Sequence, residues 1–288
     1  MSGKKIKLFD VLLYAFFIIA AFVTVYPIWY VFIGSVVPQQ VFIKNPLMII
    51  PRQMTFEAYK VVISNPVISN ALLISVFTTV AGSVISMLLT IFGAYFFSLE
   101  NVPYKSFLFM VVLVTMFFGG GLIPMYIIFA RYKLINKIMV YLVPGLINTF
   151  YMLILKTSFQ EIPSSLYEAS KIDGSGVVGY MFKIAVPLTL PAIATIFLFY
   201  TVDRWNDLYT AVFFIYKPAL YNLQYVIYNM ISGSDSSIST IITDKGTVLM
   251  REQVANAAII AAILPILCVY PFLQKYFAKG VMVGAVKD

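Results

Sequence analysis

Hydrophobic residues lie along this chain in long uninterrupted blocks. The first block runs from Val11 to Val37 without a charged residue and follows a lysine-containing N-terminus. Apolar runs of roughly 18 residues or more are long enough to cross a bilayer as helices. The remaining blocks cover about 67–97, 106–130, 138–155, 188–215 and 253–274. The pattern predicts an all-α polytopic protein with six transmembrane helices in one membrane domain over residues 1–288.

The composition supports a membrane protein. Hydrophobic residues make up 61% of the 288 positions and charged residues 11%, compared with about 25% charged in soluble domains. The chain has no histidine, which excludes imidazole metal ligands and histidine acid/base catalysis, and its single Cys268 cannot form an intramolecular disulfide. The net charge of +8 comes from scattered Lys and Arg, which favours contact with anionic lipid headgroups over nucleic acid.

The polar segment 161–191 interrupts the apolar blocks in the second half of the chain. Pro163 and the two serines after it are typical of a helix start, and Asp173-Gly174 is typical of a helix end, because glycine adopts the left-handed backbone found there. The segment therefore predicts a short exposed helix.

The residues of this segment resemble a known motif. Glu168-Ala169-Ser170, then Gly174, then Ile184-Ala185-Val186-Pro187 resembles the EAA loop of permease subunits of binding-protein-dependent ABC importers. Ser170 replaces an alanine of that motif and Val186 a leucine. The chain also resembles the carbohydrate-importing, maltose-type branch of these permeases, at Phe159, Ile162-Pro163, Leu166, Asp173, Pro187 and Pro191. The specific resemblance is concentrated here, although the hydropathy and loop order are similar over nearly the whole chain.

The resemblance implies that the loop forms a cytoplasmic coupling helix that docks on an ATPase subunit. The residues implied in this contact are Leu166, Glu168, Ala169, Ser170, Asp173 and Gly174. Glu168 and Asp173 would make polar contacts, while Leu166, Ala169 and Gly174 would allow close approach.

The resemblance also implies a complex in the bacterial cytoplasmic (inner) membrane. Its other members would be a second permease subunit forming a heterodimer, two ABC ATPase subunits that bind ATP and Mg, and an extracytoplasmic solute-binding protein. That protein would deliver an oligosaccharide to the loops Gln39–Asn65 and Tyr216–Glu252. Both termini would be cytoplasmic, and the tail from Lys275 would either reach the ATPases or be a solvated end.

Two sequence features bear on ATP. The residues Gly174 to Gly179 spell GxGxxG, but a polar helix precedes them in place of the buried strand that a dinucleotide site needs. The chain contains no GxxxxGK[ST] motif. We therefore expect a transport subunit that is not an enzyme and has no catalytic, cofactor-binding or metal-binding residues of its own.

The sequence Asp203-Arg204-Trp205-Asn206-Asp207 places several polar residues inside the fifth apolar block. Three interpretations stay open, because intramembrane charges either pair with one another or face a cavity. Asp203, Arg204 and Asp207 form a structural ion-pair network; or Asp203, Trp205, Asn206, Asp207 and Tyr209 line a sugar pathway; or the charges relay protons. The last would suit the alternative function, a self-sufficient secondary transporter or channel using Asp203, Arg204 and Asp207 for ion coupling.

Three consecutive glycines, Gly119 to Gly121, interrupt the third apolar block. They either allow close helix packing or loosen the helix.

Overall fold

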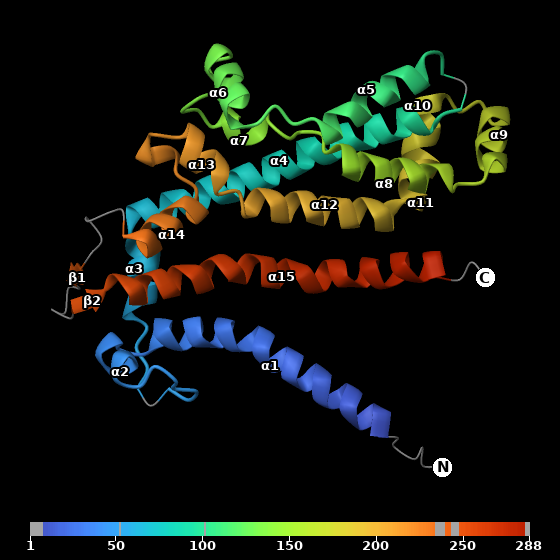
Figure 1. Ribbon diagram of the computed structural model, residues 1–288. Coiled ribbons are helices and arrows are strands. Elements are labelled where there is room, and N and C mark those ends of the chain that lie inside the picture. The colour runs from blue at the N-terminus through green and yellow to red at the C-terminus, as the bar shows by residue number, and fades with distance from the viewer. Residues whose placement is uncertain (1–7, 52, 101, 234–239, 243–247, 286–288) are drawn as a thin grey trace. The chain divides into compact units, whose positions relative to one another are not determined.

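The computed structural model describes residues 8–51, 53–100, 102–233, 240–242 and 248–285. Most of these residues are helical, as the sequence predicts (Figure 1). The chain forms two compact units, one of residues 1–69 with 226–264 and one of residues 70–225 with 265–288. The single membrane domain over 1–288 stays a prediction.

Three long helices coincide with predicted spans. They are α1 (Leu8–Val36), α4 (Pro66–Ser98) and α15 (Arg251–Ala285). Each has a stretch long and apolar enough to cross a membrane, which for α15 is Arg251–Cys268. Helix α15 contains Pro265 and Pro271 and continues to Ala285, so most of the predicted tail is helical.

The third predicted span is broken at its glycines. Helices α5 (Lys105–Phe117) and α6 (Leu122–Arg131) are bent by 116° relative to each other. A Cβ atom at Gly119 or Gly121 would have no neighbour within 4 Å, and Gly121 has φ +79°. The helix is therefore interrupted at these glycines, and within the described residues nothing packs closely on Gly119 or Gly121.

The fourth predicted span, 138–155, is not one helix. It contains α7 (Met139–Leu142) and the beginning of α8 (Thr149–Gln160). Gly145 between them has φ +69°, a conformation that ends a helix. Asn148 then caps α8 by accepting hydrogen bonds from the amides of Phe150 and Tyr151.

The fifth predicted span, 188–215, begins after a sharp bend. One helix covers Val177–Leu188 and consists of α10 (Val177–Tyr180), a π-helical turn (Met181–Ala185) and α11 (Val186–Leu188); it is bent by 82° from α12 (Leu190–Trp205). Helix α13 (Tyr209–Phe214) follows. Within the described residues three helices are long enough to span, or up to five if each bent pair is one span. The count of six therefore stays a prediction.

The two predicted outer loops contain short elements. Gln39–Asn65 holds α2 (Gln39–Lys44) and α3 (Glu57–Ser64). Tyr216–Glu252 holds a 3-10 turn, a helix and a small antiparallel pair, which are η2 (Pro218–Leu220), α14 (Leu223–Ser232), β1 (Thr240–Ile242) and β2 (Val248–Met250).

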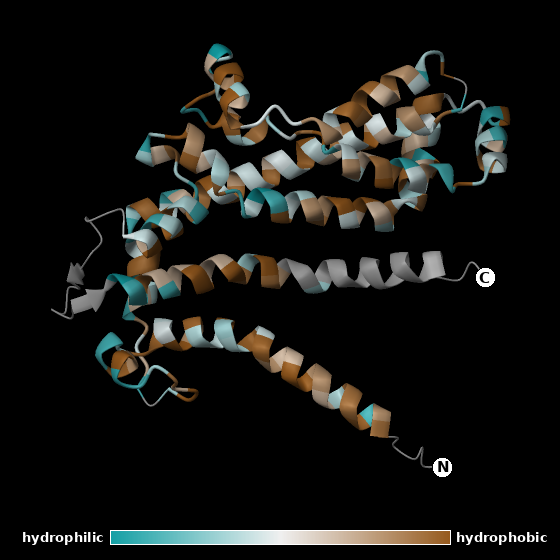
Figure 2. Cartoon of the chain, viewed as in Figure 1, coloured by the Kyte–Doolittle hydropathy of each residue, from teal (hydrophilic) through white to brown (hydrophobic). Residues whose placement is uncertain are grey.

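Apolar side chains are distributed as a bilayer requires. Helix α1 is apolar along most of its length (Figure 2). It buries only its last turn, Ile33–Val36, and leaves most of its other apolar residues exposed. In the 70–225 unit, a core forms where α4, α8, α12 and the helix Val177–Leu188 meet. Because lipid tails are as apolar as these side chains, the exposed surface of α1 is the one expected next to lipid or another membrane helix.

Candidate functional site

A short helix, α9 (Ser164–Ile172), lies where the sequence predicts one. Its end is a paired backbone cap, in which the Ser175 amide donates to the Ser170 carbonyl at 2.9 Å and the Gly174 amide to the Lys171 carbonyl at 3.1 Å. Gly174 has φ +75°, the left-handed conformation that this cap requires. The local sequence thus ends α9 sharply, as the Asp173-Gly174 pair predicts.

Helix α9 is exposed on most of its surface. Glu168, Ala169, Asp173 and Gly174 are exposed, and Leu166 is 39% exposed. Ile172 adds an apolar side chain that is 87% exposed. The structure therefore leaves five of the six residues expected at the ATPase contact accessible, all except Ser170. Figure 1 shows α9 at one end of its unit, beyond α10 and α11.

Ser170, also expected at the ATPase contact, lies on the inner face of α9. It is buried, and its hydroxyl donates to the Tyr167 carbonyl at 2.8 Å. The Tyr167 ring packs edge-on against Tyr180, with ring centroids 5.0 Å apart. Tyr167 therefore attaches α9 to its unit, while the hydrogen bond of the buried Ser170 hydroxyl stays within α9.

The charged cluster of the fifth block is organised around Arg204 on α12. Its guanidinium donates to the Tyr141 carbonyl at 2.6 Å, to Ser86 Oγ at 2.9 Å and to the Leu142 carbonyl at 3.4 Å. A Cβ atom at Gly82 would lie 2.6 Å from Arg204 Cδ and Nε. Arg204 thus joins α12 to α4 and to the α7 segment.

Each nearby carboxylate has its own partner. Asp203 is exposed and accepts a hydrogen bond from the Tyr151 hydroxyl at 2.7 Å. Asp207 accepts a hydrogen bond from the Thr210 amide at 3.0 Å, which caps the start of α13. The hydrogen bonds described for Arg204 go to neutral groups, so the ion-pair network of Asp203, Arg204 and Asp207 stays a prediction.

The aromatic and amide candidates differ in accessibility. Trp205 is 5% exposed, so its ring is covered. Tyr209 is 74% exposed and stacks on Phe213, with centroids 6.2 Å apart and 6° between the planes. Asn206 is exposed and donates to the Val202 carbonyl. Of the predicted pathway residues, Asp203, Asn206 and Tyr209 are available to a ligand of this unit.

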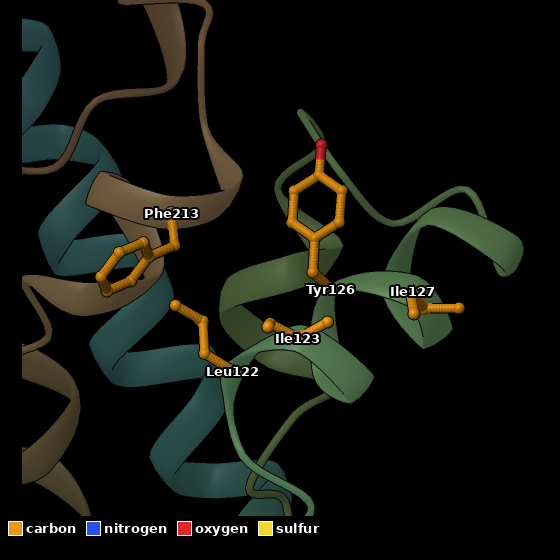
Figure 3. A pocket seen from close by; sticks show the side chains of 5 residues that line it. All are labelled: Leu122, Ile123, Tyr126, Ile127 and Phe213. Carbon is orange, nitrogen blue, oxygen red and sulfur yellow. The ribbon is translucent and has the colours of Figure 1, made fainter.

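A shallow apolar cavity lies between α6 and α13 (Figure 3). Its volume is about 280 Å³, and it is lined by Leu122, Ile123, Tyr126, Ile127 and Phe213. The Tyr126 and Tyr216 hydroxyls are 3.2 Å apart, and this hydrogen bond raises the pKa of Tyr216. The lining suits hydrocarbon better than a sugar with many hydroxyls.

Several residues that build the Arg204 site are absent from the sequence-based site prediction. They are Gly82, Ser86, Tyr141 and Tyr151. A signal exists for the first two, because α4 is rich in small residues, which is typical of helices that approach a partner closely. The tyrosines carry no such signal, since their role depends on how distant segments fold together.

Comparison with known proteins agrees with this architecture. The family described as "Binding-protein-dependent transport system inner membrane component" matches residues 91–283. Polygalacturonan/rhamnogalacturonan transport system permease protein YtcP of Bacillus subtilis (strain 168) is 37% identical, over 98% of this chain and 99% of its own length. Protein LplC of the same organism is 35% identical, over 99% of this chain and 97% of its own length.

A solved structure shows the same fold. The crystal structure of a bacterial ABC transporter involved in the import of the acidic polysaccharide alginate contains a chain with a TM-score of 0.85 and 24% identity, covering 96% of this chain and 99% of that one. The resemblance of the EAA-like loop to importer permeases is confirmed by these matches. With the family matched over 91–283 and a 37% identical relative covering 98% of its length, this chain belongs to the binding-protein-dependent transport system inner membrane components.

Proposed function

We propose that this chain is the permease subunit of an ATP-driven importer that carries an oligosaccharide across the bacterial cytoplasmic membrane. Support for a carbohydrate cargo comes from relatives: YtcP is named for polygalacturonan and rhamnogalacturonan transport, and AraQ of Bacillus subtilis (strain 168), 22% identical over 99% of this chain and 98% of its own length, for arabinooligosaccharides. In this proposal the chain pairs with a second permease, two ATPases and an extracytoplasmic binding protein.

The observation that carries the proposal is the exposed outer face of α9. Glu168, Ala169 and Ile172 are spaced so that they lie on one side of the helix, and all three are exposed. An 87% exposed isoleucine next to a carboxylate is a surface suited to a protein partner with an apolar groove and a basic rim. The ATPase subunit is that partner in our proposal.

The mechanism follows from how α9 is connected to the helix that follows it. Its cap at Gly174 sets the angle at which the chain turns into the helix Val177–Leu188. Movement of a docked ATPase therefore acts on the permease through a short, well-defined element. A permease with two conformations responds to nucleotide when the ATPases hold α9 differently in their open and closed states.

The cargo in this proposal passes the end of α12 that follows Tyr200. Asp203 and Asn206 offer hydrogen-bond acceptors and donors for sugar hydroxyls, and Tyr209 offers an exposed ring on which a sugar can stack. An exposed carboxylate on an apolar helix is expected to face a water-filled cavity or a partner subunit. The position of Asp203 thus supports a pathway role.

The proposal is tested by reversing one charge on α9. In the complex purified with its ATPases, Glu168→Lys is expected to abolish stimulated ATP hydrolysis, because it replaces the carboxylate at the docking face, while membrane insertion stays intact. The matched control is Glu100→Lys, the same change at an exposed glutamate outside α9. ATP hydrolysis and co-purification of the ATPases are measured for both variants.

Two results would contradict the proposal. Full stimulated hydrolysis in the Glu168→Lys complex would exclude α9 as the docking element. Transport by the purified chain in liposomes, without nucleotide or partners, would favour the secondary transporter that uses Asp203, Arg204 and Asp207.

A further inference from the structure

We propose that the Tyr95 hydroxyl is the clamp that makes α9 and the long helix α4 move as one body, so that Tyr95 is a positioning residue for coupling. This inference rests on the coupling function proposed for α9 above. It adds a specific residue, away from the exposed face of α9, through which movement of α9 reaches the membrane helices.

Tyr180 is the anchor shared by α9 and α4. The Tyr167 ring of α9 packs edge-on against it, with ring centroids 5.0 Å apart and 83° between the planes. The Tyr95 ring of α4 also packs against it, with ring centroids 6.5 Å apart. Tyr95 also packs edge-on against Phe159 of α8, with centroids 5.6 Å apart. A continuous row of aromatic rings therefore connects α9 with the helices of its unit.

The Tyr95 hydroxyl makes a hydrogen bond in addition to the packing of its ring. It donates a hydrogen bond to the Val177 carbonyl at 3.1 Å, although Tyr95 is only 6% exposed. Val177 is the first residue of α10, three residues after Gly174. Tyr95 thus holds the segment after the α9 cap at two points, through its ring at Tyr180 and through its hydroxyl at Val177.

The segment held in this way includes an irregular turn. The Met181 amide also donates to the Val177 carbonyl, and a π-helical turn, Met181–Ala185, begins there. Turns of this kind interrupt regular helices and are frequent at functional sites. The π-helical turn can bend when α9 moves. A movement of α9 therefore reaches α4 only if α10 is itself bound to α4, and the Tyr95–Val177 hydrogen bond provides that contact.

Helix α4 then leads from the clamp to the Arg204 site. Gly82 and Ser86, which contact Arg204, lie on the same unbroken helix as Tyr95. At 1.5 Å per residue, Gly82 is roughly 20 Å along the axis from Tyr95. A helix of this length transmits displacement as a rod. The clamp therefore joins the coupling helix to the candidate pathway residues on α12.

The test measures whether α9 and α4 stay together when nucleotide binds. Spin labels are placed by Lys171→Cys on α9 and Leu88→Cys on α4, both exposed and outside the proposed docking residues, in a Cys268→Ser background. The distance between the labels is recorded in the full complex with its ATPases, with and without ADP and vanadate. We expect one narrow distribution that nucleotide leaves unchanged in the parent protein, and a shifted or broadened one in Tyr95→Phe.

Tyr167→Phe is the matched control, because it removes one phenol hydroxyl and keeps the ring on Tyr180. It should behave as the parent protein. In Tyr95→Phe, stimulated ATP hydrolysis should fall about two- to tenfold, as for the loss of one neutral hydrogen bond, while basal hydrolysis and assembly hold and the unfolding temperature falls only slightly. If Tyr95→Phe assembles poorly, Tyr167→Ala, which removes the ring contact on the α9 side, should give the same change in distance.

An unchanged distance distribution in Tyr95→Phe would overturn the clamp. So would equal losses in basal hydrolysis, stimulated hydrolysis and unfolding temperature, because they would indicate a packing role. If the parent chain binds no ATPase at all, the proposed function itself fails, and that outcome is visible before any variant is made.

Discussion

Arg204 shows how a charge is accommodated in an apolar segment. Its guanidinium donates to two backbone carbonyls and one serine hydroxyl, and its stem lies against Gly82. A partly buried cation is costly unless its donors are satisfied. These contacts satisfy both terminal nitrogens of Arg204, whereas its Nε has no hydrogen-bond partner among the described residues. Glycine at position 82 is required because any side chain would occupy the space of the Arg204 stem.

We therefore predict that Gly82→Ala destabilises the protein by about 1–3 kcal/mol, the usual cost of overpacking. The added Cβ would meet Arg204 atoms at 2.6–2.7 Å, and moving Arg204 would break its bonds to Tyr141 and Ser86. The measurement is denaturant unfolding in detergent. Gly119→Ala, where a Cβ meets nothing within 4 Å, is the control. Equal stability of the two variants would show that Arg204 is not held at Gly82.

The sequence identifies the parts of this residue-scale site but not their contact. Arg204 is recognisable as an intramembrane charge, and Gly82 and Ser86 as members of a small-residue helix face. Nothing in their spacing shows that Arg204 reaches across to α4, because that contact depends on how helices more than a hundred residues apart pack. The contact of Tyr95 with Val177 cannot be predicted from the sequence for the same reason.

At the scale of elements, the ends of helices are where backbone conformation decides the structure. The α9 cap needs φ +75° at Gly174, whereas Gly176, two residues later, has φ −72°. A Cβ at either glycine would have nothing within 4 Å. The two positions therefore differ in backbone conformation and not in available space.

This pair gives a direct test of the cap. Gly174→Ala is expected to cost about 1–2 kcal/mol, the penalty for an L-residue in the left-handed region, while Gly176→Ala costs little. Gly174→Asn should recover part of the loss, since asparagine tolerates that conformation. The unfolding free energy and stimulated ATP hydrolysis of each variant are the measurements. Equal effects of the two alanine substitutions would remove the cap from the coupling mechanism.

Hydropathy predicts α1, α4 and the apolar part of α15 closely but does not predict breaks within apolar blocks. The run 138–155 reads as one span, yet it contains Pro144 and Gly145, and the chain folds as α7 and α8 with φ +69° at Gly145. A hydropathy average measures polarity and contains no information on backbone angles. The three glycines after α5 are a stronger signal, although by themselves they are compatible with close packing as well as with a loosened helix.

For the whole molecule, the proposed function depends on how the chain crosses the membrane between α9 and Lys217. The helices Val177–Leu188 and Leu190–Trp205 meet at 82°, so they form either one broken span or a re-entrant loop. Lys and Arg are scattered over loops at both ends of the helices, so the positive-inside rule does not decide the orientation. The proposed function requires a broken span, with α9 on the cytoplasmic side and the carbohydrate entering from the other.

Thiol labelling decides between these arrangements. In a Cys268→Ser background, Glu168→Cys and Lys217→Cys each place one cysteine at an exposed position. With a membrane-impermeant maleimide, right-side-out vesicles should label the cysteine at 217 only, and inverted vesicles the one at 168 only. Detergent-solubilised protein, in which both react, controls for reactivity. Labelling of both from the same side would mean a re-entrant loop, and labelling of 168 from outside would place α9 beyond the reach of any cytoplasmic ATPase.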